Sequence, residues 1–237
     1  MRRIGVQLSK RFMSGCLVIE SIIIPVLNGY DLLERCVASI PEPARRILII
    51  DNGDELAANG FYDSPHDVRV VSSPTNLGVA TSWNLGIKME AFATGWLLLN
   101  HDAWFDPGAF YAFENDCAED RITLAGSPPW CCAWIGRGVV SRVGLFCEAF
   151  HPAYMEDVDY QRRADVRGVP VVLSGAVVHH DNSSTIRSSG KYQRMNDESH
   201  AANNRVYQER WGSVGLGCVP SVLEWSLATR LAQSWDS

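Results

Sequence analysis

Two kinds of residue in the sequence could take part in chemistry: carboxylates that follow short apolar runs, and a tight group of acids. Asp51 and Asp102 each come after an apolar run, and Glu156, Asp157 and Asp159 lie within four residues of one another. A carboxylate at a strand end can bind a hard divalent cation, and crowded acids raise one another's pKa, which suits a general base. Both features also have plainer explanations, because Asp is common in turns and acids are common in the first turn of a helix.

The elements that would position these residues follow from hydrophobic periodicity. In the first half, strands are predicted at 17–26, 46–51, 68–72 and 96–99, and helices at 30–40 and 80–92. This alternation predicts an α/β fold with a mostly parallel central sheet flanked by helices. In such sheets ligands bind beyond the carboxyl ends of the strands. Four polar clusters fall on that edge, at Asn28, Asp51, Asn76 and Asp102.

The second half adds strands at 122–126, 131–135, 169–173 and 176–180, and helices at 156–167 and 199–211. The charged side chains of Arg162 and Arg163 are expected on a solvated helix face. The serine-rich segment 181–191 predicts a mobile loop. We therefore expect a leader at 1–16, one domain at 17–212 and an extension at 213–237. Within the domain, residues 17–106 would bind the donor and residues 107–212 the acceptor.

The composition and the net charge indicate which classes of protein are compatible with this sequence. The 237 residues are 46% hydrophobic and carry a formal net charge of −6, with basic residues scattered along the chain. A large nucleic-acid footprint is disfavoured, although a nucleic-acid acceptor is not excluded. No run approaches the roughly 20 apolar residues of a membrane span, and the seven cysteines lack C-x-x-C spacing. The expectation is a protein with reduced thiols, in the cytoplasm or peripheral to a membrane. Its oligomeric state does not follow from the sequence.

Six segments, in order, resemble motifs of the family 2 glycosyltransferases of the A-type (GT-A) fold, over about residues 21–212. They are Ser21-Ile-Ile-Ile-Pro-Val-Leu-Asn28, Ile49-Ile-Asp-Asn-Gly-Asp54, Asn76-Leu-Gly-Val-Ala80 with Asn84-Leu-Gly86, Leu97-Leu-Leu-Asn-His-Asp102, Tyr154-Met-Glu-Asp-Val-Asp-Tyr-Gln-Arg-Arg163, and Val177-Val-His-His180. The resemblance implies a single-domain GT-A enzyme. Such an enzyme moves a sugar from a nucleotide-diphosphate sugar to an acceptor hydroxyl with inversion, using Mn²⁺ or Mg²⁺.

The resemblance also implies roles for individual residues. Asp102 would bind the metal with help from His179 or His180. Asp157 would be the catalytic base, and Glu156 would touch the acceptor or support the geometry of the base. Asn100 stands where the family frequently has an aspartate. The residues implied on the donor side are Pro25, Asn28, Asp51, Asn76, Gly78, Asn84, Asn100 and His101.

Two tryptophans could form a wall for a sugar acceptor. Trp130 and Trp134 follow a Pro-Pro turn ahead of the acidic group, and aromatic rings stack on the apolar faces of sugars. Core packing is the alternative for both. The family's late histidine segment resembles Val177-Val-His-His180 followed by residues 183 and 184. The spacing to residue 184 slightly favours His180 over His179 as the residue near the metal.

Two other functions are compatible with parts of this pattern. A nucleotidyltransferase would carry a Gly-rich loop with a basic residue after the first strand, but Asn28-Gly29-Tyr30 stands there. A catalytically silent module that binds a nucleotide sugar or a glycan is the other alternative, and the asparagine at position 100 favours it.

Overall fold

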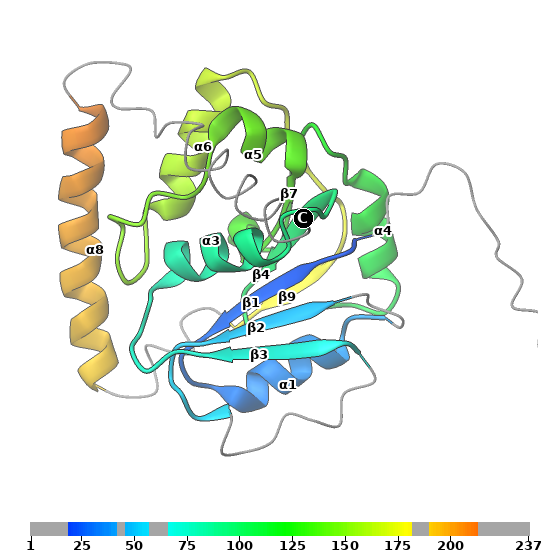
Figure 1. Ribbon diagram of the computed structural model, residues 1–237, viewed down its shortest axis with the longest axis horizontal. Helices are drawn as coiled ribbons and strands as arrows, with labels where there is room; N and C mark the ends of the chain where they lie inside the picture. The colour runs from blue at the N-terminus through cyan, green and yellow to red at the C-terminus, as the bar shows by residue number, and fades with distance from the viewer. Residues whose placement is uncertain (1–18, 42–45, 57–65, 182–189, 213–237) are drawn as a thin grey trace, which may run out of the picture.

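The computed structural model describes residues 19–41, 46–56, 66–181 and 190–212. Its centre is a seven-stranded sheet in the order β3-β2-β1-β4-β7-β6-β8 (Figure 1). Only β7 runs antiparallel to its neighbours within this sheet. The strands are β1 (Ile22–Val26), β2 (Ile47–Asp51), β3 (Val68–Ser72), β4 (Gly95–Leu99), β6 (Ile122–Ala125), β7 (Cys132–Gly136) and β8 (Val171–Leu173). The predicted mostly parallel sheet is confirmed.

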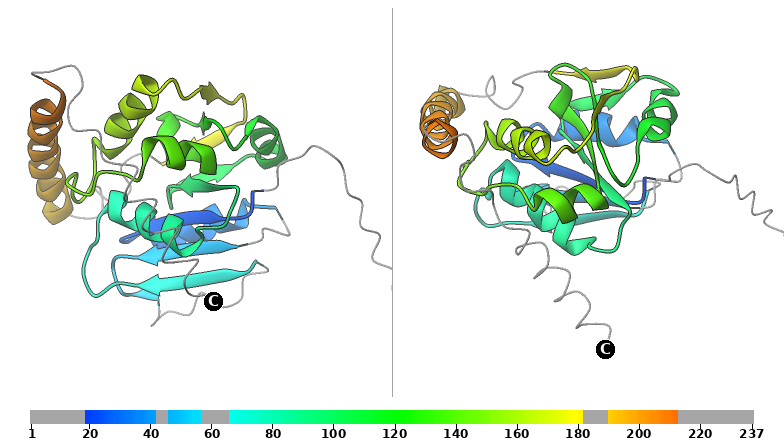
Figure 2. Two further views of the ribbon diagram at one scale, coloured as in Figure 1. Left: turned by 45° about the horizontal axis from the view of Figure 1, so that its top comes forward. Right: turned by 90° about the horizontal axis from the view of Figure 1, so that it is seen from above.

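Helices cover both faces of the sheet, and each face has its own apolar core (Figure 2). Helices α1 (Tyr30–Ala38) and α4 (Ala109–Asp116) pack on one face. Helices α3 (Val79–Met89), α5 (Arg137–Val143) and α6 (Glu156–Val166) pack on the other. Successive side chains of a strand point to opposite faces, so Ile22 and Ile24 join the first core while Ile23 joins the second. The central strands are therefore apolar along their whole length.

Three further elements complete the described fold. A small second sheet pairs β5 (Ala103–Phe105) with β9 (Val178–His180), and a 3₁₀ turn, η1 (Pro129–Cys131), precedes β7. The last helix, α8 (Gly190–Trp211), stands at the side of the molecule, outside both helix layers (Figure 1). No helix in the described residues is long and apolar enough to cross a membrane.

Several predicted boundaries shift in the structure. The strand predicted at 176–180 is β9, which pairs with β5 instead of joining the main sheet. Helix α8 begins at Gly190, nine residues earlier than predicted. Elements β5, α4 and α5 were not predicted; the first is only three residues long and the two helices have weak sequence signals. The leader at 1–16, residues 182–189 of the predicted loop and the extension at 213–237 lie outside the described residues.

Candidate active site

Asp102 and His180 meet at the carboxyl end of β4. The pairing of β5 with β9 sets Ala103 opposite His180, and the main-chain oxygen of Asp102 accepts a hydrogen bond from Asp181 N at 3.0 Å. His180 Nε2 lies 2.9 Å from Asp102 Oδ1 and 3.3 Å from Asn100 Nδ2. Both the His180 and the Asp102 side chains are more than nine-tenths buried. The structure thus groups three of the predicted residues in one place.

His179 lies on the opposite face of β9. Its ring stacks on Trp104 with centroids 5.4 Å apart, and its Nε2 lies 2.7 Å from Asp106 Oδ1. The guanidinium of Arg35 covers the Trp104 ring at 3.4 Å. Of the two predicted histidines, only His180 is brought to Asp102, as expected from the alternation of side chains along a strand.

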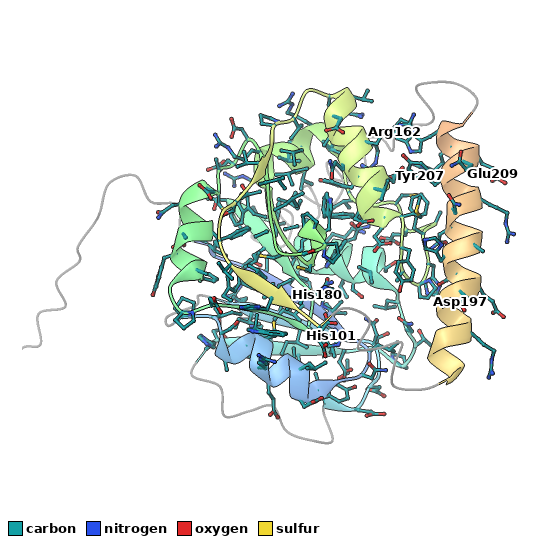
Figure 3. The ribbon with its side chains drawn as sticks, turned by 180° about the vertical axis from the view of Figure 1, so that it is seen from behind. His101, Arg162, His180, Asp197, Tyr207 and Glu209 are labelled. Atoms are coloured by element: carbon teal, nitrogen blue, oxygen red, sulfur yellow. The ribbon has the colours of Figure 1, made fainter. Side chains whose placement is uncertain are left out.

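His101 extends this group toward the loop after β1. Its ring is buried, and its Nε2 has no hydrogen-bond partner within the described part of the chain. A Cβ placed on Gly29 would lie 3.3 Å from this nitrogen, so the loop that carries Asn28 passes close to His101. Burial lowers the pKa of His101, which favours a neutral ring at physiological pH. Figure 3 shows His101 and His180 in the same region of the molecule.

Asp51, at the end of β2, organises its own loop. The side chain is fully buried, and its Oδ1 accepts hydrogen bonds from Tyr30 Oη at 3.1 Å and Gly53 N at 3.0 Å. Its Oδ2 accepts one from Leu56 N at 2.9 Å. Burial, and then the charge of Asp51, raise the pKa of Tyr30. Contact between Asp51 and a nucleoside stays a prediction.

Asn52 was not among the predicted site residues, yet it links two of the predicted segments. Its amide nitrogen donates to Ser82 Oγ at 3.0 Å, and its amide oxygen accepts from Leu77 N at 2.9 Å. Nearby, Asn76 Oδ1 accepts from Gly78 N at 2.9 Å and closes a turn. The only feature of the sequence that could have indicated Asn52 was its place beside Asp51 in a polar turn. The end of β2 is thereby fixed to the segment that opens α3.

That segment also contacts the loop before α6. Val79 N donates to Pro152 O at 2.7 Å, and His151 Nε2 lies 3.1 Å from Asn76 O. Gly78 has a φ of +78°, and a Cβ there would lie 2.7 Å from Pro152 O. Only glycine adopts this backbone without strain and leaves room for the carbonyl. The segment at 76–79 is therefore in direct contact with residues 151 and 152, in the loop that leads to α6.

Asn84 holds two segments of the described fold together. Its amide nitrogen donates to Phe146 O at 2.9 Å and to Glu148 Oε1 at 2.8 Å, and its oxygen accepts from Phe146 N at 2.9 Å. The side chain is buried. It fixes the loop after α5 to α3. The predicted contact of Asn84 with a donor stays a prediction. The same holds for the predicted donor contacts of Pro25, in β1, and of Asn28, after β1.

The two predicted tryptophans differ. Trp134 is fully buried in β7, and its Nε1 donates to Ala118 O at 2.8 Å, so its predicted place in an acceptor wall is wrong. Trp130 in η1 is only partly buried and donates from Nε1 to Gln161 Oε1 at 2.9 Å. Gln161 lies four residues after Asp157, on the same face of α6. Trp130 therefore contacts the helix face that carries the predicted base.

The same turn reaches the end of β4. Asn100 N donates to Cys131 O at 2.9 Å, and Cys131 follows Trp130 directly in η1. Because β7 is antiparallel to β4, with Leu99 opposite Cys132, its first residues lie at the carboxyl edge of β4. A continuous series of contacts therefore runs from the Asn100–Asp102 turn through η1 to α6. The structure thus links α6, through Gln161, to the carboxyl end of β4.

The three acids in the first turn of α6 have three different environments. Glu156 is buried with Oε2 unpartnered among the described residues, and burial followed by the charge of Asp157 raises its pKa to about 8. Asp157 is partly exposed and accepts a hydrogen bond from Val158 N at 2.8 Å; burial raises its pKa. Asp159 is fully buried and ion-paired. Of these three acids, only Asp157 has a partly exposed side chain that a ligand could reach.

Asp159 is a structural residue. Its carboxylate accepts hydrogen bonds from Arg163 Nε at 2.9 Å, Arg210 Nε at 3.1 Å and Trp211 Nε1 at 2.9 Å. Arg163 is fully buried and also donates to Val143 O at 3.0 Å. The prediction that Arg163 lies on a solvated face is therefore wrong, because its paired acid draws it into the protein.

The comparisons with known proteins concern the family of one segment and the fold of the chain. The family model described as "Glycosyl transferase family 2" matches residues 21–125, which include β1 to β4 and the Asn100–Asp102 turn. Residues 21–125 are thus similar to glycosyl transferase family 2. The acidic start of α6 lies beyond the match. None of the curated proteins compared matches the sequence.

The likeness of fold to one solved structure covers more of the chain than the family match does. A structure of GalNAc-T7 with UDP, GalNAc and Mn²⁺ superposes with a TM-score of 0.58 at 12% identity, covering 69% of this chain and 44% of that one. Residues 1–349 of S. aureus TarS give a TM-score of 0.49 at 14% identity, covering 69% and 58%. The chain thus spans about half the length of these structures. The likeness to GalNAc-T7 shows the GT-A fold.

The donor set at the end of β4 fits a divalent cation. Two ligands at right angles, each about 2.1 Å from an octahedral ion, lie about 3 Å apart. The 2.9 Å between Asp102 Oδ1 and His180 Nε2 matches this spacing. The described residues contain no group of three or more His, Cys, Asp or Glu side chains that could hold a metal ion. An octahedral ion at Asp102 and His180 would need further oxygen ligands, which a diphosphate can supply.

The pKa of Glu156 leads to a prediction about stability. The folded protein keeps this proton up to about pH 8, whereas an ordinary Glu loses it near 4.5. The free energy of unfolding should therefore fall between these pH values by on the order of a few kcal/mol. Glu156→Gln, which cannot ionise, should match the wild type near pH 5 and melt several degrees higher at about pH 8.5.

Thermal melts of wild type, Glu156→Gln and Glu198→Gln across this pH range provide the check. Glu198 is exposed on α8, so its variant should follow the wild type at every pH. A difference between Glu156→Gln and wild type that does not change with pH would contradict the raised pKa.

Proposed function

We propose that this chain transfers a sugar from a nucleotide-diphosphate sugar to a hydroxyl of an acceptor, with inversion at the anomeric carbon and with Mn²⁺ or Mg²⁺. The observation that carries the proposal is the contact series from Asn100 through Cys131 and Trp130 to Gln161 of α6. It joins a carboxylate suited to a cation to a carboxylate suited to a base. The match of residues 21–125 to the glycosyl transferase family 2 model supports the same reaction.

The chemistry assigns a separate task to each acidic region. The bond from the anomeric carbon to the diphosphate oxygen breaks while the bond to the acceptor oxygen forms on the opposite face. A divalent cation would neutralise the charge that builds on the diphosphate. Asp102 and His180 would hold this cation, and the unpartnered Nε2 of His101 would hydrogen-bond the donor near the Asn28 loop.

Asp157 would take the proton of the acceptor hydroxyl. It is the partly exposed acid of the cluster, and burial moves its pKa upward, toward values useful for a base. Glu156 would stay protonated beside it at neutral pH, so the site would carry one negative charge there and not two. Trp130, on the same face of α6, would border the acceptor. On this proposal residues 17–106 bind the donor and residues 107–212 the acceptor.

The test is metal-dependent donor binding followed by transfer. GalNAc-T7 was solved with UDP and Mn²⁺, so UDP and UDP-sugars are the first probes, with GDP- and dTDP-sugars as the comparison set. A ligand that binds only the folded protein raises its melting temperature. We expect one nucleotide series to stabilise the protein with Mn²⁺ and not with EDTA. Binding without turnover for any acceptor would favour a catalytically silent module, and no binding in any series would contradict both functions.

His180 and His179 form a matched pair for this assay. His180→Ala should weaken Mn²⁺-dependent binding of UDP about 10- to 100-fold, because it removes the ring beside Asp102. His179→Ala should leave that affinity unchanged, because the ring faces Trp104 and Asp106. Isothermal titration with and without Mn²⁺ measures both. Equal losses in the two variants would show that the metal site does not lie at Asp102.

A further inference from the structure

The turn that leads into α6 has an unusual backbone. Tyr154 and Met155 have φ values of +77° and +75°, although neither is glycine. Side chains make this left-handed conformation unfavourable, so it persists only where the surrounding structure enforces it. Met155 is the N-cap residue of α6, directly before Glu156 and Asp157. The position of the proposed base therefore depends on whatever holds this turn.

The side chain of Asn203, in α8, forms hydrogen bonds with this turn. It is buried, and its Nδ2 donates to Ala153 O at 2.7 Å and to Tyr154 O at 3.1 Å. An amide group has two hydrogens, so these two bonds use both of them. A leucine or an aspartate of similar size cannot make either bond.

Helix α8 is itself anchored at its other end. Arg210 and Trp211 bond to Asp159 inside the protein, and Arg162 lies over the Trp211 ring at 4.3 Å. Figure 3 shows Arg162 on α6 close to Tyr207 on α8, and Arg162 Nη1 donates to Tyr207 Oη at 3.2 Å. The anchor fixes α8 against α6, so Asn203 reaches the turn from a rigid support.

We propose that Asn203 is a positioning residue that holds the Ala153–Met155 turn and, through it, the Asp157 carboxylate in the geometry needed for transfer. The proposal rests on the proposed function, because it assumes that Asp157 is the base. A displacement of about 1 Å can lower the rate of an enzyme about 100-fold. Loss of the two hydrogen bonds should therefore lower kcat and leave donor binding, which takes place at the strand ends, unchanged.

The experiment compares Asn203→Leu and Asn203→Asp with Asn204→Leu. Asn204 is the next residue of α8 and is exposed, which makes its leucine variant a matched control. We expect kcat to fall about 10- to 100-fold in both Asn203 variants, with the KM for the donor within about twofold of wild type. Amide hydrogen exchange at residues 153–158 should become at least about tenfold faster in the same variants. Asn204→Leu should match the wild type in all three measurements.

Each outcome decides the proposal. Faster exchange with lower kcat and an unchanged KM supports it. Unchanged exchange overturns it, and so does faster exchange with an unchanged kcat, since the base would then not depend on the turn. Asn203→Asp preserves the size of the side chain and keeps the test valid if the leucine variant does not fold. If the wild type itself transfers no sugar, the proposed function and the role of Asn203 in transfer both fail, while hydrogen exchange still decides whether Asn203 holds the turn.

Discussion

Replacing Asp157 with asparagine is expected to lower the rate of sugar transfer about 100- to 10,000-fold, the usual contribution of a general base. The amide has the size of the carboxylate but cannot accept the proton of the attacking hydroxyl. Donor affinity should stay within about twofold, because binding of the diphosphate takes place at Asp102 and His180 on the proposed function. Steady-state kinetics gives the first quantity, and titration of UDP in the presence of Mn²⁺ gives the second.

Asp165→Asn is the control for this variant. Asp165 is exposed on the same helix, so the same chemical change there should leave the rate unaltered. The rate of the wild type should also fall toward acid pH as Asp157 takes up a proton, and this decline should be absent from any residual activity of Asp157→Asn. Ordinary turnover by Asp157→Asn would remove Asp157 from the mechanism. The raised pKa of Glu156 makes that side chain a poor substitute at neutral pH, because it remains protonated there.

Asp159→Ala should have the largest effect on stability, with a loss of about 3–5 kcal/mol in the free energy of unfolding. The substitution leaves Arg163 fully buried without its ion-pair partner and removes the hydrogen bonds to Arg210 and Trp211. Urea unfolding followed by tryptophan fluorescence measures the loss. Asp165→Ala, on the exposed side of α6, should change the free energy of unfolding by less than about 0.5 kcal/mol.

A loss below about 1 kcal/mol for Asp159→Ala would contradict the buried pairing of Asp159 with Arg163. The variant should also speed hydrogen exchange in α8, because the anchor of that helix is lost. This pattern differs from that of Asp157→Asn, which should change the rate of transfer without changing stability. The two neighbouring acids therefore give separable results.

Much of the fold could be predicted because the central strands are continuous apolar runs between polar turns. β3 occupies the residues predicted for it, and β2 differs from its prediction by a single residue at its start. The prediction was weaker where tertiary contacts decide the outcome. β9 comes from an apolar run, as the other strands do. It pairs, however, with β5, a three-residue strand that lies far from it in the sequence. Helix α4 is short and has a modest apolar face, so periodicity gave little signal for it.

The candidate site was predictable where a single strand end fixes a residue, as at Asp51 and Asp102. It was not predictable where function depends on contacts between distant segments. Nothing in the sequence near Asn203 indicates that its amide binds two carbonyls 49 and 50 residues earlier. The spacing of Asp159 and Arg163 allows an ion pair along the helix, but it does not reveal that the pair is buried. The burial depends on partners remote in the sequence, such as Arg210 and Trp211, which bond to Asp159.

The antiparallel direction of β7 has a consequence for how such an enzyme can diversify. The loop at 126–131 connects β6 directly to the antiparallel β7, whereas the loops after β1 and β3 lead into helices α1 and α3. Residues of the β6–β7 loop therefore belong to a different connection from the loops after β1, β2 and β3. An exchange of this loop must keep Gly126, which has a φ of +90° and contacts Cys131 closely. On the proposed function, grafting this short loop from one relative to another would be a route to new acceptors with the donor retained.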